Sequence, residues 1–294
     1  MAIDPFMRRQ IIGLAEAKLQ AADVVNVLPT PLERVAEVAG VEEIIAIDDI
    51  PDDLVANKPN MLKRILGAYL YRSNTAFVDL SQPVGRQRFI LAHETGHKIV
   101  PWHEDSHYLD DEIRLFRDSE EELEEEANLA GTLLMFQGAR FHQRALDFEN
   151  GLRTPIAMAD EYGASMHASI WYYTEHHPEP VALVIAGQHL RSDGTVPVWR
   201  SVQSKTFTER FGSVRQWLPT RGVPIQNSDH PLCAATSAAF SATDVTTDTV
   251  IVPDLQGSSV RCSVDTFFNR RCLFLMLTPK RTLRRGRRLA IRAS

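Results

Sequence analysis

In the first 178 residues, apolar positions recur every three to four residues, which is the spacing of helices that bury one face. Thr30 and Ser81 precede two such segments and are suited to cap the start of a helix, while Gly40 suits a helix end. Segments 68–71 and 75–80 are typical of short strands. The pattern predicts helices over residues 8–24, 31–39, 82–100, 118–135, 156–162 and 165–175.

The pattern changes after residue 178. Short apolar segments bounded by Gly, Ser, Asp and Pro are typical of strands. They lie at residues 181–186, 196–202, 249–252 and 272–277. We therefore predict an α+β protein with two domains. Residues 1–178 form a mainly helical domain with a short β-sheet, and residues 179–294 form a strand-rich domain that senses a signal or binds the substrate.

The composition is that of an ordinary globular protein. Of the 294 residues, 44% are hydrophobic and 24% are charged. The most apolar runs, 180–187 and 272–277, are far shorter than the roughly 20 residues of a membrane-spanning helix. Cys233, Cys262 and Cys272 lack CxxC spacing and are expected to be buried apolar side chains. We expect a cytoplasmic protein without a membrane partner.

Charge is distributed unevenly along the chain. Residues 1–150 contain 15 Lys and Arg against 27 Asp and Glu, whereas residues 151–294 contain 17 against 11. The asymmetry indicates two units with different surfaces. An acidic N-terminal half is poorly suited to bind nucleic acid by itself, because such binding depends on neutralising phosphates.

The strongest chemical signal is His93-Glu94-Thr95-Gly96-His97, within the helix expected over residues 82–100. A spacing of four places His93 and His97 on one helical face, one turn apart, where both imidazoles can bind one zinc ion. Glu94 is adjacent and can take a proton from an attacking water molecule. Apolar residues flank the motif, so the helix is expected to be buried, and buried polar groups need partners.

A catalytic zinc site needs a third protein ligand, and two candidates compete. His103 has the spacing of an extended three-histidine motif, but Val100 stands where that motif has the glycine that lets the chain turn back. The other candidate is a glutamate of the following acidic helix. Glu124 precedes Asn128 by one turn, so that Asn128 could support a zinc-binding histidine. Spacing alone does not choose among Glu124, Glu125 and Glu126.

These segments together resemble the ImmA/IrrE family of metallopeptidases. The resemblance rests on Arg86-Gln-Arg-Phe-Ile-Leu-Ala-His-Glu-Thr-Gly-His97, on Glu124-Glu-Glu-Ala-Asn128 and on Leu133-Leu-Met135, and it covers roughly residues 10–175. The chain departs from the family pattern at Phe136, where a proline is usual, and at Ala130-Gly131.

The resemblance implies a zinc peptidase in which His93, His97 and Glu124 hold Zn²⁺ and Glu94 is the general base. It also implies a protein substrate, a helix-turn-helix transcriptional repressor, whose cleavage would derepress genes of a stress response or a mobile element.

Two alternatives remain. The first is a non-proteolytic regulatory or sensor protein with a structural metal site. The second is a DNA-binding regulator that uses the helix-turn-helix-like segment 157–171 or the basic tail 280–292. Direct nucleic-acid binding is disfavoured, because the second helix of that segment lacks Lys and Arg for phosphates and base edges. His176 and His177 are expected to be exposed loop residues.

Overall fold

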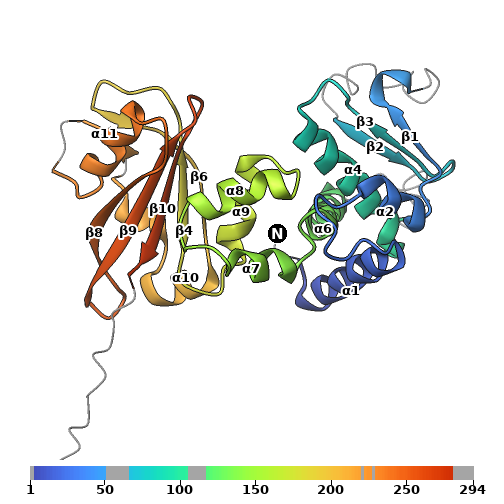
Figure 1. The fold of residues 1–294 in the computed structure, drawn as a ribbon, viewed down its shortest axis with the longest axis horizontal. Helices are drawn as coiled ribbons and strands as arrows, with labels where there is room; N and C mark the ends of the chain where they lie inside the picture. Colours follow the sequence, from blue (N-terminus) through green and yellow to red (C-terminus); the bar gives the residue numbers. More distant parts are fainter. Residues whose placement is uncertain (1–2, 51–65, 105–116, 220–221, 227–228, 281–294) are drawn as a thin grey trace, which may run out of the picture. The chain divides into compact units, whose positions relative to one another are not determined.

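The computed structural model describes residues 3–50, 66–104, 117–219, 222–226 and 229–280 (Figure 1). Their contacts form two compact units. The first unit comprises Met1–Glu149 and Thr154–Ile170, and the second comprises Asn150–Arg153 and Trp171–Ser294. Both contain helices and strands, which confirms the α+β class. Within these described ranges, no helix is long and apolar enough to cross a membrane. The functional division at residue 178 stays a prediction.

The first unit is mainly helical, as predicted. Its helices are α1 (Pro5–Ala21), α2 (Leu32–Ala39), α4 (Val84–Ile99), α6 (Arg117–Phe136), α7 (Ala139–Ala145), nearly all of α8 (Arg153–Glu161) and the first half of α9 (Met166–Glu175). Its strands are β1 (Glu43–Ala46), β2 (Gly67–Leu70) and β3 (Thr75–Val78). A short 3-10 turn, Ile47–Asp49, follows β1. The expected helices and the two expected strands all form, within a few residues of their predicted ends.

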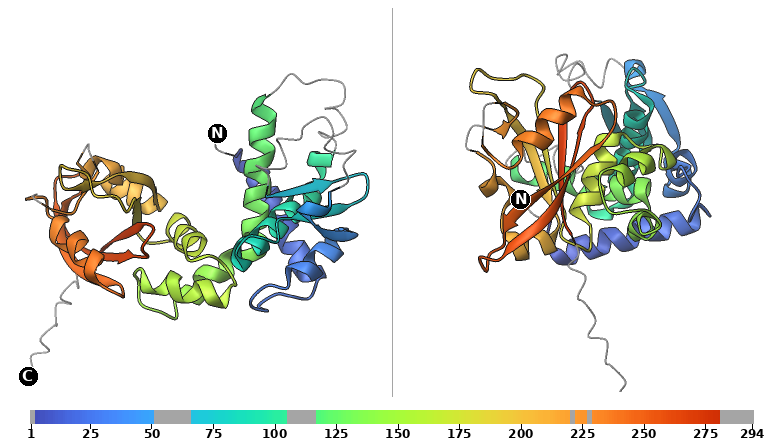
Figure 2. Two further views of the ribbon diagram at one scale, coloured as in Figure 1. Left: turned by 90° about the horizontal axis from the view of Figure 1, so that it is seen from above. Right: turned by 60° about the vertical axis from the view of Figure 1, so that its left-hand side comes forward.

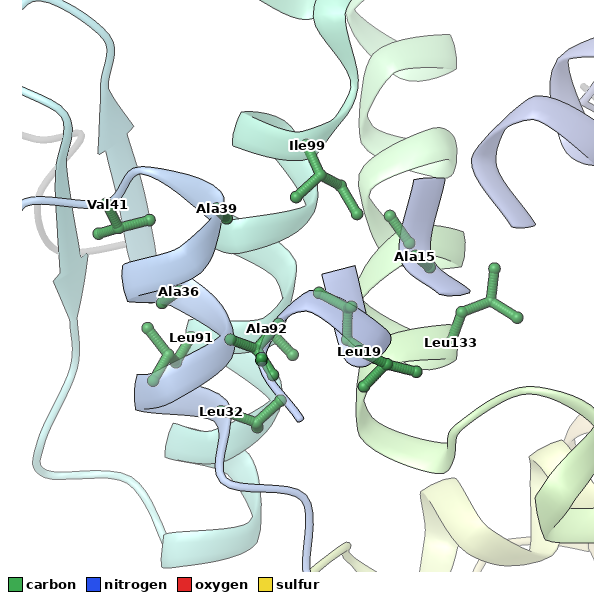
Figure 3. Close-up of a cluster of buried hydrophobic side chains, with 14 of the residues drawn as sticks. Ala15, Leu19, Leu32, Ala36, Ala39, Val41, Leu91, Ala92, Ile99 and Leu133 are labelled. Atoms are coloured by element: carbon green, nitrogen blue, oxygen red, sulfur yellow. The ribbon is translucent and has the colours of Figure 1, made fainter. Parts of the chain in front are cut away.

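The core of this unit is built mainly from the apolar faces of α1, α2, α4 and α6. Figure 3 shows Leu32 of α2 beside Leu91 and Ala92 of α4, with Leu19 of α1 between them and Leu133 of α6. All five side chains are buried. Each helix thus places its apolar face in this cluster, away from water. The buried cluster therefore fixes α4 and α6 against each other.

A small mixed sheet covers another side of α4. Its strand order is β1-β3-β2, with β1 parallel and β2 antiparallel to β3. Both β2 and β3 pack against α4 (Figure 1). Since β2 lies at the edge of the sheet, one of its sides is not paired with another described strand.

Two expected helix caps are wrong. The Thr30 hydroxyl is buried and donates to the Met135 carbonyl at 3.2 Å, so α2 begins after Pro31 without a side-chain cap. The Ser81 hydroxyl donates to Asp79 at 2.6 Å, and α4 begins only after Pro83. In both cases the hydroxyl donates to another acceptor and does not accept a hydrogen bond from the first turn of the helix that follows. Gly40 ends α2 with φ 95°, as expected.

Small residues allow α4 and α6 to approach closely. A Cβ added at Gly131 of α6 would lie 2.8 Å from the backbone nitrogen of His93. One added at Gly96 of α4 would lie 2.7 Å from the Ala127 carbonyl oxygen. Both positions meet backbone, which cannot rotate away, so glycine is required where the two helices cross.

Gly131→Ala is therefore expected to lower the free energy of unfolding by about 1–3 kcal/mol through overpacking. Alanine is otherwise the better helix former by about 1 kcal/mol. The matched control is Gly13→Ala in α1, where nothing lies within 4 Å of the added Cβ and a small gain in stability is expected. Chemical denaturation of both metal-free variants measures the difference. Equal gains at the two positions would contradict the close crossing.

The second unit is strand-rich, as predicted, and contains elements that the pattern did not reveal. Its main sheet is antiparallel with the order β6 (Val198–Gln203), β4 (Ala182–Ala186), β10 (Leu273–Pro279), β9 (Ser259–Phe268) and β8 (Thr246–Pro253). Helix α11 (Cys233–Ser241) packs against β8 and β9 (Figure 2). The unexpected elements are β9, α11, α10 (Lys205–Phe211), a 3-10 turn (Val214–Trp217) and β7 (Val223–Pro224). A further strand, β5 (Thr195–Val196), pairs with β7 in a separate two-stranded sheet.

One histidine of this unit corrects the sequence interpretation. His177 is buried, not exposed, and its Nε2 lies 3.1 Å from Asn150 Oδ1. His176 is half-buried at the end of α9. Cys262 and Cys272 are buried, as expected, and Cys233 is half-buried. The basic tail after Lys280 lies outside the described residues.

Candidate metal centre

Three side chains from α4 and α6 converge on one point. The Nε2 atoms of His93 and His97 lie 3.2 Å apart on successive turns of α4. Glu124 of α6 places Oε2 3.2 Å from His93 Nε2 and Oε1 3.5 Å from His97 Nε2. One ligand atom from each side chain lies within 4.8 Å of the other two. We call His93, His97 and Glu124 the ligand cluster.

The cluster forms because α6 crosses α4 on the helical face that carries His93 and His97. Glu124 lies two turns before Gly131, and its side chain is 56% exposed, so it reaches the histidines from the solvent side. One turn after Glu124, Asn128 places Oδ1 3.1 Å from His93 Nδ1. This contact leaves His93 Nε2 facing the cluster, as the Glu124–Asn128 spacing predicts.

Electrostatics holds the cluster together. Hydrogen bonds from His93 and His97 keep the pKa of Glu124 well below its usual range, with burial opposing them. Burial lowers the pKa of His93, but its contacts with Glu124 and the charge of Glu94 outweigh burial and raise it overall. The charged carboxylate of Glu124 therefore accepts hydrogen bonds from both histidines and attracts the protonated ring of His93.

Glu94 lies beside the cluster without joining it. Its side chain is 4% exposed, and this burial raises its pKa to about 7. Gly67, the first residue of β2, abuts it: an added Cβ there would clash with the Glu94 carboxylate and with Ile90. The glycine thus leaves room for a buried carboxylate between α4 and the edge of the sheet. Nothing in the sequence pattern pointed to Gly67.

His103, the competing third ligand, contacts the other nitrogen of His97. Its Nδ1 lies 3.1 Å from His97 Nδ1, and its Nε2 lies 3.0 Å from Glu126 Oε2. Helix α4 ends at Ile99, Val100 is extended, and helical backbone resumes at Pro101. The structure therefore brings Glu124, and not His103, to the Nε2 side of both histidines.

Neither Glu125 nor Glu126 belongs to the ligand cluster. Glu126 is 8% exposed and accepts a 2.6 Å hydrogen bond from Trp102 Nε1. Burial raises the pKa of Glu126, and the Trp102 hydrogen bond opposes that rise. Glu125 is half-buried and does not belong to the ligand cluster. Sequence reasoning missed the contacts among Trp102, His103 and Glu126, although Trp102 and His103 follow the motif by only five and six residues.

The donor set of the cluster fits a zinc ion. Two imidazole nitrogens and one carboxylate oxygen are ligands that zinc prefers in catalytic sites, where a fourth position stays open. Each histidine has its Nδ1 engaged by another side chain, so both Nε2 atoms face the same point.

The comparisons with known proteins agree with this arrangement. The family model Peptidase_M78, described as an IrrE N-terminal-like domain, matches residues 61–169, a range that includes the ligand cluster and Glu94. The match confirms the resemblance to the ImmA/IrrE family. Over these residues the chain is similar to that family of metallopeptidases and IrrE-like regulators.

A solved structure supports the fold alone. A Mycobacterium tuberculosis transcriptional regulator aligns over 92% of this chain and 75% of its own, with a TM-score of 0.53 and 13% identity. No curated protein matches the chain.

Proposed function

We propose that this protein is a zinc-dependent endopeptidase of the cytoplasm that cleaves a protein partner. The observation that carries the proposal is the ligand cluster beside the buried carboxylate of Glu94. The family match supports a metal-dependent peptidase.

The proposed mechanism assigns a task to each side chain. His93, His97 and Glu124 would hold the zinc ion, which when bound polarises a peptide carbonyl and makes a water molecule more acidic. Glu94 takes the proton from the attacking water on its carboxylate and later gives it to the leaving amine. A pKa of about 7 suits both transfers, since the group can be charged before the attack and protonated after it. Asn128 orients the His93 ring.

We further propose a helix-turn-helix repressor as the substrate, whose cleavage would release genes of a stress response or a mobile element. This part rests on the ImmA/IrrE resemblance. The mycobacterial structure is titled a transcriptional regulator, a description that concerns that protein.

The DNA-binding alternative is weakened by the packing of α9. Ser169, Ile170 and Tyr173 of this helix are buried. Its exposed positions, such as His167 and Glu175, include neither Lys nor Arg. A helix that reads DNA needs such side chains on its free face. The alternative of a regulator with a structural metal site keeps the same ligands and differs only in the absence of cleavage.

Elemental analysis of the gently purified protein is expected to give about one zinc per chain. The protein is then incubated with helix-turn-helix repressors encoded near it in its genome, and fragments are identified by mass spectrometry. Zinc with cleavage that a chelator abolishes supports the peptidase, whereas zinc without cleavage of any repressor favours the regulator. Absence of a tightly held transition metal contradicts both. Binding to DNA that weakens steeply with salt would favour the third function.

A further inference from the structure

Behind His97, away from the ligand cluster, lies a continuous row of hydrogen-bonded groups. Trp102 Nε1 donates to Glu126 Oε2 at 2.6 Å, and the same oxygen lies 3.0 Å from His103 Nε2. His103 Nδ1 then lies 3.1 Å from His97 Nδ1. His103 is 0% exposed, so the row is shielded from water at its centre. The proposed chemistry has assigned no task to these residues.

The donors and acceptors along this row are ordered, and Trp102 sets their order. The indole N–H of Trp102 can only donate, and an ionised carboxylate can only accept. With Glu126 ionised and His103 neutral, His103 must therefore carry its proton on Nε2, which donates to Glu126, and its Nδ1 is left as an acceptor. The facing Nδ1 of His97 must then carry a proton. In neutral His97 this leaves Nε2 with a lone pair, on the side where Glu124 and His93 lie.

The two cluster histidines differ in how firmly their protonation pattern is fixed. His93 Nδ1 faces the amide of Asn128, which is exposed and can present either its oxygen or its nitrogen after a rotation. His97 faces a buried row that ends on a donor-only group. The hydroxyl of Tyr71 also donates to the His97 carbonyl at 3.0 Å and so anchors its backbone. His97 is thus the preorganised member of the pair.

We propose that Glu126 and His103 are positioning residues that keep His97 in the tautomer with its proton on Nδ1, so that Nε2 is ready to bind a metal ion. This inference rests on the proposed zinc site. It gives a task to the histidine that spacing alone offered as a ligand: His103 acts through His97 and does not touch the metal. It also separates neighbouring glutamates of α6, with Glu124 binding the metal and Glu126 directing a ligand.

The first test reads the tautomer directly in the metal-free protein. Long-range ¹H–¹⁵N correlation spectra at about pH 8, where histidine is neutral, distinguish a protonated Nδ1 from a protonated Nε2. His97 is expected to carry the proton on Nδ1 and His103 on Nε2. The opposite assignment at His97 would overturn the proposal. This readout requires neither zinc nor activity, so it stands even if the proposed peptidase function fails.

The second test compares variants by their zinc dissociation constants, measured in competition with a chromophoric chelator. His103→Phe removes the acceptor for His97 Nδ1, and Glu126→Leu removes the acceptor for His103. Both are expected to weaken zinc binding about 10–100-fold. Glu126→Gln is the matched control, because an amide oxygen in the place of Oε2 still accepts from both Trp102 and His103. It is expected to bind zinc within about threefold of the unaltered protein, a range well inside the 10–100-fold loss.

A merely structural role makes a different prediction. It would make Glu126→Leu less stable in denaturation of the metal-free protein, while the tautomer of His97 and the zinc affinity of the folded fraction stay unchanged. That result would overturn the proposal. Should the two disruptive variants not fold, His103→Asn offers an amide oxygen near the place of Nδ1. This variant is expected to keep His97 protonated on Nδ1 and to bind zinc with an affinity close to that of the unaltered protein. A shift of His97 to the Nε2-protonated form would count against the inference.

Discussion

Glu94→Gln is expected to reduce cleavage of the protein substrate by about 10²–10⁴-fold while the zinc content stays at its original level. The amide keeps the shape of the side chain but cannot take a proton from water. Burial already disfavours the charged form of this group, since it raises the pKa of Glu94 to about 7, so the site tolerates an uncharged amide. Glu94 is not part of the ligand cluster, and metal binding should therefore survive.

Single-turnover cleavage rates and elemental analysis of the same preparation measure both effects. Glu122→Gln, an exposed position on α6, is the control and is expected to cleave at the original rate. A Glu94→Gln variant that cleaves normally would show that another group accepts the proton. Loss of zinc in that variant would instead show that Glu94 is a ligand.

The helical half of the fold was predictable because its signals are local. A motif with a spacing of four fixes the relation of His93 and His97 on any helix, whatever surrounds it. Where the outcome depends on distant partners, local reasoning failed: the Thr30 hydroxyl bonds to Met135, more than a hundred residues away, and does not cap α2.

The second unit shows a different limit. Strand β4 is an uninterrupted apolar run and is recognised as a strand because both of its faces are buried. Strand β9 mixes buried and exposed positions irregularly, and its Asp265 accepts a hydrogen bond from the Leu152 backbone at 2.9 Å. A buried carboxylate with a distant backbone partner interrupts the apolar pattern that would have revealed the strand.

The candidate site shows the same contrast between local signals, which are readable from the sequence, and distant partners, which are not. Position along α6 could not choose among the three glutamates, because each is within one residue of the next and only the crossing with α4 decides which faces the histidines. The missing glycine at Val100 argued against His103 as a ligand, yet it said nothing about where His103 goes. Its place behind His97 depends on Trp102 and Glu126, which belong to different helical segments.

Glu124→Ala is expected to abolish tight zinc binding, with a loss greater than the 10–100-fold that removal of an outer hydrogen-bond partner costs. The reason is that a donor atom disappears: the carboxylate oxygens lie 3.2 and 3.5 Å from the two Nε2 atoms. Cleavage is expected to fall with the metal, and added zinc should restore it only at concentrations far above those that saturate the unaltered protein.

The order of zinc affinities across α6 decides between the possible third ligands. Glu125→Ala should bind zinc as the unaltered protein does, Glu126→Leu more weakly, and Glu124→Ala most weakly. If Glu125→Ala or Glu126→Leu instead loses the metal while Glu124→Ala keeps it, the peptidase class survives with a different ligand. If His103→Phe alone loses the metal and Glu124→Ala keeps it, the centre holds its ion through three histidines. That outcome would require His103 to leave His97 Nδ1, from which it now lies 3.1 Å away, and to reach the opposite side of the ring.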